Sequence, residues 1–166
     1  MEKKYGVYIC TGCGIGDALD IDGLCATVKK ARKTAKTHPF LCGQDGVSML
    51  KKDISEEGVN TLVIAACSRR VNFDIFRFDG CIVDRVNLRE QVVWSHPKGD
   101  KSADINHTQM LANDYLKMGM VKVEKILLPD PFKLENFSKK ILVIGGGVTG
   151  ISAALDAAKV GYDVTI

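Results

Sequence analysis

The sequence contains no long apolar run. Across its 166 residues, no uninterrupted apolar stretch approaches the roughly 18 to 20 residues that a membrane-spanning helix needs. The start, Met1-Glu2-Lys3-Lys4, leads directly into a strand-like segment instead of the apolar core of a signal sequence. Internal repeats and low-complexity tracts are also absent. These absences argue against a membrane span, a secreted protein and a repeat array, so we expect a globular cytoplasmic protein.

Neither sign of charge dominates. The chain has 23 basic and 20 acidic residues, a formal net charge of +3. The basic residues gather only between Lys29 and Lys36. On a helix such a run is most often a solvated face, and a docking patch for an acidic partner is the minority interpretation. Because nothing else in the sequence supports it, we predict no nucleic-acid binding.

Short apolar segments rich in β-branched residues alternate with helical patterns, which is the order expected of a parallel α/β sheet. The predicted strands are Tyr5–Ile9, Thr37–Leu41, Thr61–Ala66 and Cys81–Val86, and the predicted helices between them are Ile21–Lys33, Gly46–Glu57 and Phe73–Phe78. A longer amphipathic helix is predicted from Asp104 to Lys122. The fold class is therefore predicted to be α/β, beginning with a small parallel-sheet domain.

A proline-containing segment interrupts both periodicities near residue 130. It reads Leu128-Pro129-Asp130-Pro131-Phe132 and is followed by polar residues up to Lys140. We predict an N-terminal cysteine-bearing α/β domain over residues 1–127, a linker over 128–139 and the start of a second domain over 140–166.

The chain has six cysteines, which in a cytoplasmic protein should be thiols, metal ligands or redox groups rather than structural disulfides. Cys10, Cys42 and Cys67 each directly follow a predicted strand. The carboxyl ends of parallel strands share one edge of the sheet, where ligands bind, so these thiols can converge. Cys13 forms a C-x-x-C pair with Cys10 in a glycine-rich loop.

Four thiolates suit either a [4Fe–4S] cluster or a structural Zn²⁺ ion, and the residues alone do not choose between them. A thioredoxin-like redox pair at Cys10 and Cys13 and plain core cysteines remain alternatives. Cys25 lies within a helical pattern and Cys81 begins a strand. We expect these two to be packed side chains rather than ligands.

A glycine turn lies near the end of the chain. The apolar segment Lys140–Ile144 runs into Gly145-Gly146-Gly147-Val148-Thr149-Gly150, which matches G-x-G-x-x-G, and a helical pattern and a second strand, Tyr162–Ile166, follow. In the Rossmann-type fold, the first glycine permits a tight turn, the second lets the backbone approach a pyrophosphate, and the third lets the helix pack closely on the strand. Helix N–H groups at Val148 and Thr149 then face the phosphates. The acidic residue expected about 20 positions later falls at or beyond Ile166, so we expect a longer natural protein.

Together these features resemble the iron–sulfur flavoprotein that forms the A-subunit of heterodisulfide reductase, and its relatives in quinone-interacting membrane-bound oxidoreductase complexes. The motifs that carry the resemblance are, in order, Gly6-Val7-Tyr8-Ile9-Cys10 with Cys13-Gly14, Phe40-Leu41-Cys42, Val63-Ile64-Ala65-Ala66-Cys67-Ser68-Arg69-Arg70, Asn87-Leu88-Arg89-Glu90-Gln91 with Trp94 and His96, and Ile144–Gly150. The resemblance implies [4Fe–4S] ligation by Cys10, Cys13, Cys42 and Cys67. It also implies that Gly145–Gly150 contacts the pyrophosphate of FAD at the start of a Rossmann-like domain.

The resemblance further implies an oxidoreductase subunit that moves electrons between FAD and iron–sulfur centres, with the other redox subunits of a complex as partners. The alternatives are an interaction module that holds Zn²⁺ or nothing, and a dithiol reductase using Cys10 and Cys13. No catalytic base or nucleophile stands out, and we expect the chain by itself to be inactive. Arg69, Arg70 and Arg89 are expected to pair with nearby carboxylates more readily than with a cofactor, and His96 is expected to anchor a loop.

Overall fold

The computed structural model describes residues 2–96, 105–128, 130 and 132–166. The chain divides into two compact units, Met1–Leu128 and Pro129–Ile166, which are described separately below. Within the described residues, no helix is long and apolar enough to cross a membrane.

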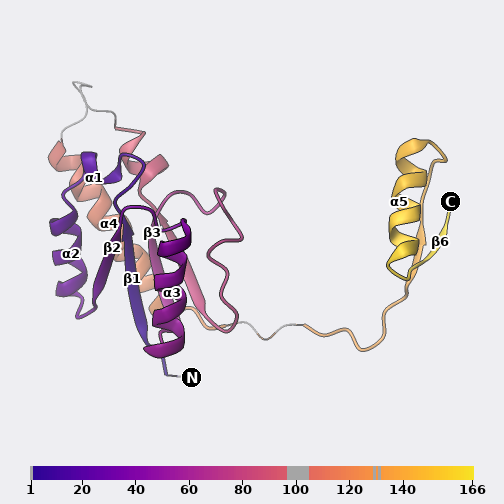
Figure 1. The fold of residues 1–166 in the computed structure, drawn as a ribbon, viewed down its shortest axis with the longest axis horizontal. Coiled ribbons are helices and arrows are strands. Elements are labelled where there is room, and N and C mark those ends of the chain that lie inside the picture. The colour runs from indigo at the N-terminus through magenta and orange to yellow at the C-terminus, as the bar shows by residue number, and fades with distance from the viewer. Residues whose placement is uncertain (1, 97–104, 129, 131) are drawn as a thin grey trace. The chain divides into compact units, whose positions relative to one another are not determined.

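The first unit is built on a four-stranded parallel sheet in the order β2-β1-β3-β4 (Figure 1). Its strands are β1 (Tyr5–Cys10), β2 (Ala35–His38), β3 (Thr61–Ala66) and β4 (Ile82–Asn87). Every residue of β3 is buried, as expected of a central strand covered on both faces. β4 alternates buried and half-buried side chains, so only one face of this strand is deeply packed.

Helices cover both faces of this sheet, with α2 and α4 on one side and α3 on the other (Figure 1). The first unit contains α1 (Ile15–Ala18), α2 (Ile21–Lys30), α3 (Gln44–Glu56), a π-helical turn η1 (Arg89–Val93) and α4 (Ile105–Lys125). Asp20 caps α2 by accepting a hydrogen bond from the Gly23 N–H at 3.0 Å. α2 and α4 are joined by a hydrogen bond from Thr27 Oγ1 to Asn113 Oδ1 at 2.8 Å.

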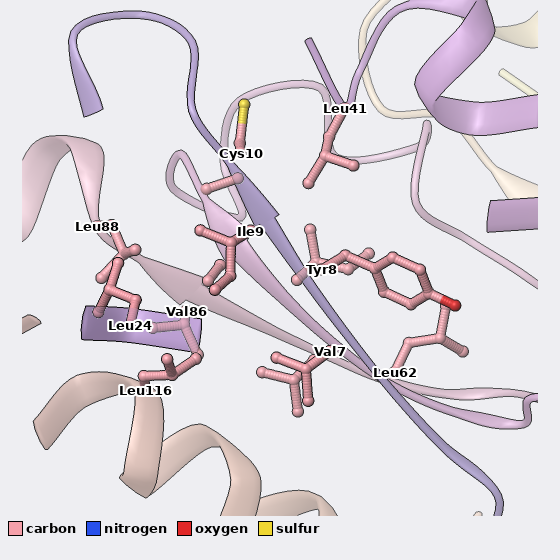
Figure 2. Packing of buried hydrophobic residues seen from close by; sticks show 14 of the residues in the cluster. Val7, Tyr8, Ile9, Cys10, Leu24, Leu41, Leu62, Val86, Leu88 and Leu116 are labelled. Carbon is pink, nitrogen blue, oxygen red and sulfur yellow. The ribbon is translucent and has the colours of Figure 1, made fainter. Parts of the chain in front are cut away.

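Alternation along β1 supplies side chains to both layers of the core (Figure 2). Val7 and Ile9 lie on the side of Leu24 from α2 and Leu116 from α4. Tyr8 points the other way, and its hydroxyl donates to Asp53 Oδ2 of α3 at 2.8 Å. Two faces packed by one strand fix its register, because a one-residue slip would exchange them.

Several predicted elements are present with shifted ends. The predicted strand Thr37–Leu41 is instead Ala35–His38, since Pro39 has no N–H to donate to the ladder. The helix predicted to reach Lys33 ends at Lys30, and Arg32 then takes a left-handed φ of 56° that ends the helical run. α4 runs on to Lys125, and its predicted first residue, Asp104, lies outside the described residues.

The predicted helix Phe73–Phe78 is wrong, because the structure has irregular turns over this segment. The carbonyls of Val71 and Asn72 accept hydrogen bonds from Arg85 Nη1 at 2.7 and 3.2 Å. Asn72 also has a φ of 47°, outside the helical region. A side chain from β4 therefore satisfies backbone groups that a helix would have used internally.

The second unit contains β5 (Lys140–Leu142), α5 (Val148–Lys159) and β6 (Asp163–Thr165). The two strands are parallel and pair Ile141 with Val164, which gives the strand–turn–helix–strand order predicted for the glycine turn. Both strands are shorter than predicted, each having three residues. The fold class is mixed α/β with a small parallel sheet and a Rossmann-like beginning, as predicted.

Candidate metal centre at the carboxyl edge of the sheet

The four predicted cysteine ligands line one cavity in the first unit. Cys10 is the last residue of β1, and Figure 2 shows its sulfur beyond Ile9 at the end of the strand. Cys67 directly follows β3, Cys42 lies in the turn between β2 and α3, and Cys13 lies in the turn after β1. β2 and β3 flank β1 on opposite sides, so the cavity occupies the point where the strand order reverses. This point is where ligands bind in open α/β sheets.

The turn over residues 11–14, called the cysteine turn below, is held close to the segment that carries Cys42. A Cβ atom added at Gly12 would lie 2.0 Å from the carbonyl oxygen of Pro39, a contact that no larger residue can make without backbone movement. Cys13 and Gly14 follow with left-handed φ values of 53° and 83°, and Gly16 N–H donates to the Thr11 carbonyl at 3.0 Å. The strained conformation at Cys13 brings the second thiol of the pair back to the cavity.

The four thiols that could act as metal ligands differ in their exposure to solvent. Cys10 and Cys67 are buried, Cys42 is half-buried and Cys13 is exposed. Thiolates in this number suit an iron–sulfur cluster or zinc. The cavity is small, with about 30 Å³ open to the centre of a water-sized sphere. Among the described residues, no three Cys, His, Asp or Glu side chains are already close enough to hold a single metal ion.

Arg85 of β4 contacts this site through the sulfur of Cys67. Its Nη2 donates to Cys67 Sγ at 3.0 Å and to the Cys67 carbonyl at 3.3 Å. Its guanidinium stacks on Phe76 at 4.8 Å, and Phe76 itself lines the cavity. The buried Nε of Arg85 has no hydrogen-bond partner among the described residues. Burial raises the pKa of the Cys67 thiol, while the positive charges of Arg85 and Arg89 act in the opposite direction.

A second arginine lies on the cavity wall but is already paired. Arg89 lines the cavity and donates from Nη2 to Glu90 Oε1 at 2.7 Å. Glu90 Oε2 accepts the Ser68 N–H at 2.7 Å, which ties η1 to the turn after Cys67. Burial raises the pKa of the Glu90 carboxyl, but the pairing with Arg89 and the Ser68 N–H bring it below its ordinary value. The carboxylate is therefore charged near neutral pH and holds Arg89 in place.

Three curated proteins similar to this chain are described as the A-subunit of a heterodisulfide reductase or as a protein like it. A protein of Archaeoglobus profundus, described as like the A-subunit of heterodisulfide reductase, is 34% identical over 98% of this chain. The iron–sulfur A-subunit of the CoB–CoM heterodisulfide reductase of Methanocaldococcus jannaschii is 31% identical over 99%. The A-subunit of the ferredoxin- and F420H2-dependent enzyme of Methanosarcina acetivorans is 34% identical over 98%.

The chain belongs to the family of heterodisulfide reductase A-subunits. It spans 24%, 26% and 21% of the lengths of these three relatives. No family model matches the chain.

In this member of the heterodisulfide reductase A-subunit family, two of the three arginines expected to pair with carboxylates do so. Arg69 Nη2 donates to Asp84 Oδ1 at 3.0 Å, and Arg89 donates to Glu90. His96 contacts the Val92 carbonyl through Nδ1 at 2.9 Å and holds the end of η1, as expected of a loop anchor.

Sequence reasoning missed Arg85. The signal that could have found it is its place on a strand directly after Asp84, where alternation puts the two side chains on opposite faces. A charged residue on each face of a strand covered by other elements needs a partner on each side.

The glycine turn of the second unit has the geometry that its three glycines predict. Gly145 has a φ of 114°, which favours glycine strongly. A Cβ at Gly150 would lie 1.9 Å from the Gly145 carbonyl oxygen, so the helix packs tightly on the turn. Gly147, the N-cap of α5, has no atom within 4 Å of an added Cβ. The N-terminus of α5 at Val148 and Thr149 is therefore approachable, as phosphate binding at a helix N-terminus requires.

Proposed function

We propose that this chain holds a [4Fe–4S] cluster through Cys10, Cys13, Cys42 and Cys67, and that the longer protein relays electrons between this cluster and FAD. The observation that carries the proposal is the cavity that all four thiols line at the carboxyl edge of the sheet. Family membership supports it, because one relative is named as an iron–sulfur subunit. When bound, the cluster supplies a one-electron relay. The chain's own residues would bind it, exclude water and donate hydrogen bonds to its thiolates.

Anaerobic purification, analysis of iron and sulfide, and electron paramagnetic resonance of the reduced sample test the ligand set. We expect about four irons per chain for a cubane cluster, and loss of most of this iron in Cys67→Ser. Cys25→Ser is the matched control, because Cys25 lies on α2 away from the cavity. Stoichiometric zinc without a cluster signal would favour the interaction module. Loss of activity on alkylation of Cys10 and Cys13 in a metal-free protein would favour the dithiol reductase.

Arg85 provides a further test that depends on the cluster itself. A positive charge and an N–H···S bond stabilise the more negative, reduced state of a cluster and raise its reduction potential. Arg85→Met should therefore lower the potential measured by a redox titration, while Arg85→Lys, which keeps the charge, should lower it less. A potential that is the same in all three proteins would show that the contact with Cys67 has no electronic role.

We further propose that the second unit begins an FAD domain, whose remaining part covers its apolar surface. Leu142 is 68% exposed, Ile144 92% and Val148 82%, which is unusual for a strand and helix that carry a dinucleotide-binding turn. The names of the relatives as subunits support partner subunits of a heterodisulfide reductase-type complex. Without further chain to bind the adenosine, residues 140–166 should bind FAD weakly or not at all. A yellow 166-residue protein with stoichiometric flavin would overturn this expectation.

A further inference from the structure

A second pocket, of about 580 Å³, lies at the carboxyl ends of β3 and β4 and shares no lining residue with the cysteine cavity. Its walls are the turn Ser68–Arg70, the second half of β4 and the face of α4 that includes Lys122. The helix approaches the strand closely, because a Cβ at Gly119 would lie 2.3 Å from Val86 Cγ2. The pocket is therefore framed by a strand, a helix and a loop.

The charge of this pocket is strongly unbalanced. The lining residues include four cations, Arg69, Arg70, Arg85 and Lys122, and one carboxylate, Asp84. The guanidinium of Arg85 is already bonded to Cys67 Sγ and to the Val71 and Asn72 carbonyls. The cations that can face a ligand are therefore Arg69, Arg70 and Lys122. Ser68, Asn87 and Gln91 add neutral hydrogen-bonding groups. A concave surface with this excess of positive charge attracts anions and focuses their approach.

Asp84 organises two of the cations and does not oppose an anion. Its side chain is only 8% exposed and accepts from Arg69 Nη2 at 3.0 Å and from Lys122 Nζ. Two cations on one buried carboxylate leave a net positive charge at the mouth of the pocket. Arg69 is 64% exposed, and within the described part of the chain its Nε and Nη1 donate to no residue. These donors are thus oriented and available before any ligand arrives.

Arg70 adds a cation that the fold does not use. In the described ranges its side chain makes no hydrogen bond and no ion pair, and only its backbone N–H is bonded, to Ser68 Oγ at 3.3 Å. Guanidinium groups bind phosphate through two parallel N–H···O bonds, which makes arginine the preferred residue for phosphate recognition. Two arginines with free donors on one turn can therefore hold one or two phosphate groups.

We propose that this pocket binds the phosphate groups of a small phosphorylated ligand. Its volume falls in the range of small-molecule sites, which are concave and of roughly 300–1,000 Å³. Its place at the carboxyl ends of parallel strands is where α/β sheets bind such ligands. The pocket shares no lining residue with the cysteine cavity, and in the described part of the chain Arg69, Arg70 and Lys122 form no hydrogen bond with a thiol, so the proposal stands whether or not the cysteines hold a cluster.

Titration calorimetry of the 166-residue chain with inorganic pyrophosphate, at low ionic strength, tests the proposal. We expect one binding site, with an affinity that falls as salt is added because salt screens exposed charges. Arg70→Ala should weaken binding about tenfold, the effect of losing one charge-assisted interaction. Because Arg70 makes no side-chain contact with a polar group in the described fold, this variant should remain folded.

Lys30→Ala is the matched control. Lys30 lines a different pocket of similar volume, about 610 Å³, together with Lys117, so its loss removes the same charge from another site. Pyrophosphate affinity unchanged by Lys30→Ala and reduced by Arg70→Ala supports the proposal. Equal weakening by both variants would indicate non-specific attraction and overturn it. Absence of binding at millimolar pyrophosphate, or tighter binding of a glutamate-rich peptide in the same pocket, would overturn it too.

Discussion

The two units of this chain differ in how much of their apolar surface they cover. The first unit closes a core around its sheet, with side chains such as Leu50, Ile64 and Leu116 fully buried. In the second unit, Ala154 is the one residue of the described part that is buried, while Ile144 is 92% exposed. A βαβ unit buries its faces only when neighbouring elements pack on it. The first unit therefore has a core of its own, whereas the described part of the second unit leaves most of its apolar side chains uncovered.

The largest loss of stability is expected when a buried side chain in the core of the first unit is truncated. Leu50→Ala removes a fully buried side chain of α3 and should lower the free energy of unfolding by about 2–5 kcal/mol, because it leaves a cavity as well as losing apolar burial. Urea unfolding followed by circular dichroism measures this change.

The matched variant in the second unit is Leu155→Ala. Leu155 lies on α5 and is 55% exposed, so its truncation should change the free energy of unfolding by less than about 0.5 kcal/mol. Equal losses in the two variants would show that the second unit is as well packed in solution as the first.

The turns that contain Gly12 and Gly147 offer a second contrast between the two units, with an expected effect on stability of intermediate size. Gly12→Ala forces a Cβ to within 2.0 Å of the Pro39 carbonyl oxygen, so the cysteine turn must move at a cost of about 1–3 kcal/mol. Gly147→Ala places its Cβ in open space, at a φ of −73°, and should cost less than about 0.5 kcal/mol. Denaturant unfolding of both variants measures the difference.

The cysteine turn has a second measurable property besides stability. If Cys10 and Cys13 are ligands, Gly12→Ala should also retain less iron than the unaltered chain. A variant that is as stable and as rich in iron as the unaltered chain would contradict the close contact between this turn and the Cys42 segment.

Much of this fold could be predicted from periodicity, and the failures have local causes. Thr61–Ala66 was predicted with its observed ends because its apolar run is continuous and uninterrupted by proline or glycine. The strand before Cys42 was misplaced because Pro39 ends it early. The segment Phe73–Phe78 was misread because apolar spacing alone suggests a helix, whereas hydrogen bonds from Arg85 on a later strand cannot be inferred from spacing.

The candidate metal centre, too, could be predicted from the sequence only in part. Parallel strand ends predict that Cys10, Cys42 and Cys67 approach one another, and the structure has them around one cavity. The contact from Arg85 to Cys67 could not be predicted, since it depends on the register of β3 with β4 and on where an arginine side chain extends. The role of these cysteines as ligands stays a prediction until metal is measured.

The smallest expected effect is electrostatic and lies at the rim of the first unit's core. Lys36 Nζ donates to Asp53 Oδ1 at 2.7 Å and to Glu57 Oε1 at 3.0 Å, and these hydrogen bonds raise the pKa of Lys36. A lysine whose pKa is higher in the folded state than in the unfolded state stabilises the fold. This contribution is fully present at pH values below the pKa of the unfolded state, about 10.4, and is lost as the pH rises through the pKa of the folded state. Stability should therefore decline above about pH 10.

Lys36→Met tests the pairing at neutral pH as well. Asp53 is only 5% exposed and would keep the Tyr8 hydroxyl as its partner, so the variant should lose about 1 kcal/mol and show a flatter decline in stability at alkaline pH. Lys52→Met is the control, because Lys52 pairs with Glu56 at 3.8 Å with both side chains more than 60% exposed, an arrangement worth less than about 0.5 kcal/mol. Urea unfolding at a series of pH values from about 7 to about 11, which spans the lysine titration, measures both. If the two variants lose the same free energy of unfolding at every pH, the buried carboxylate of Asp53 is stabilised by Tyr8 alone. The ion pair with Lys36 then adds nothing to the stability of the core that distinguishes the first unit from the second.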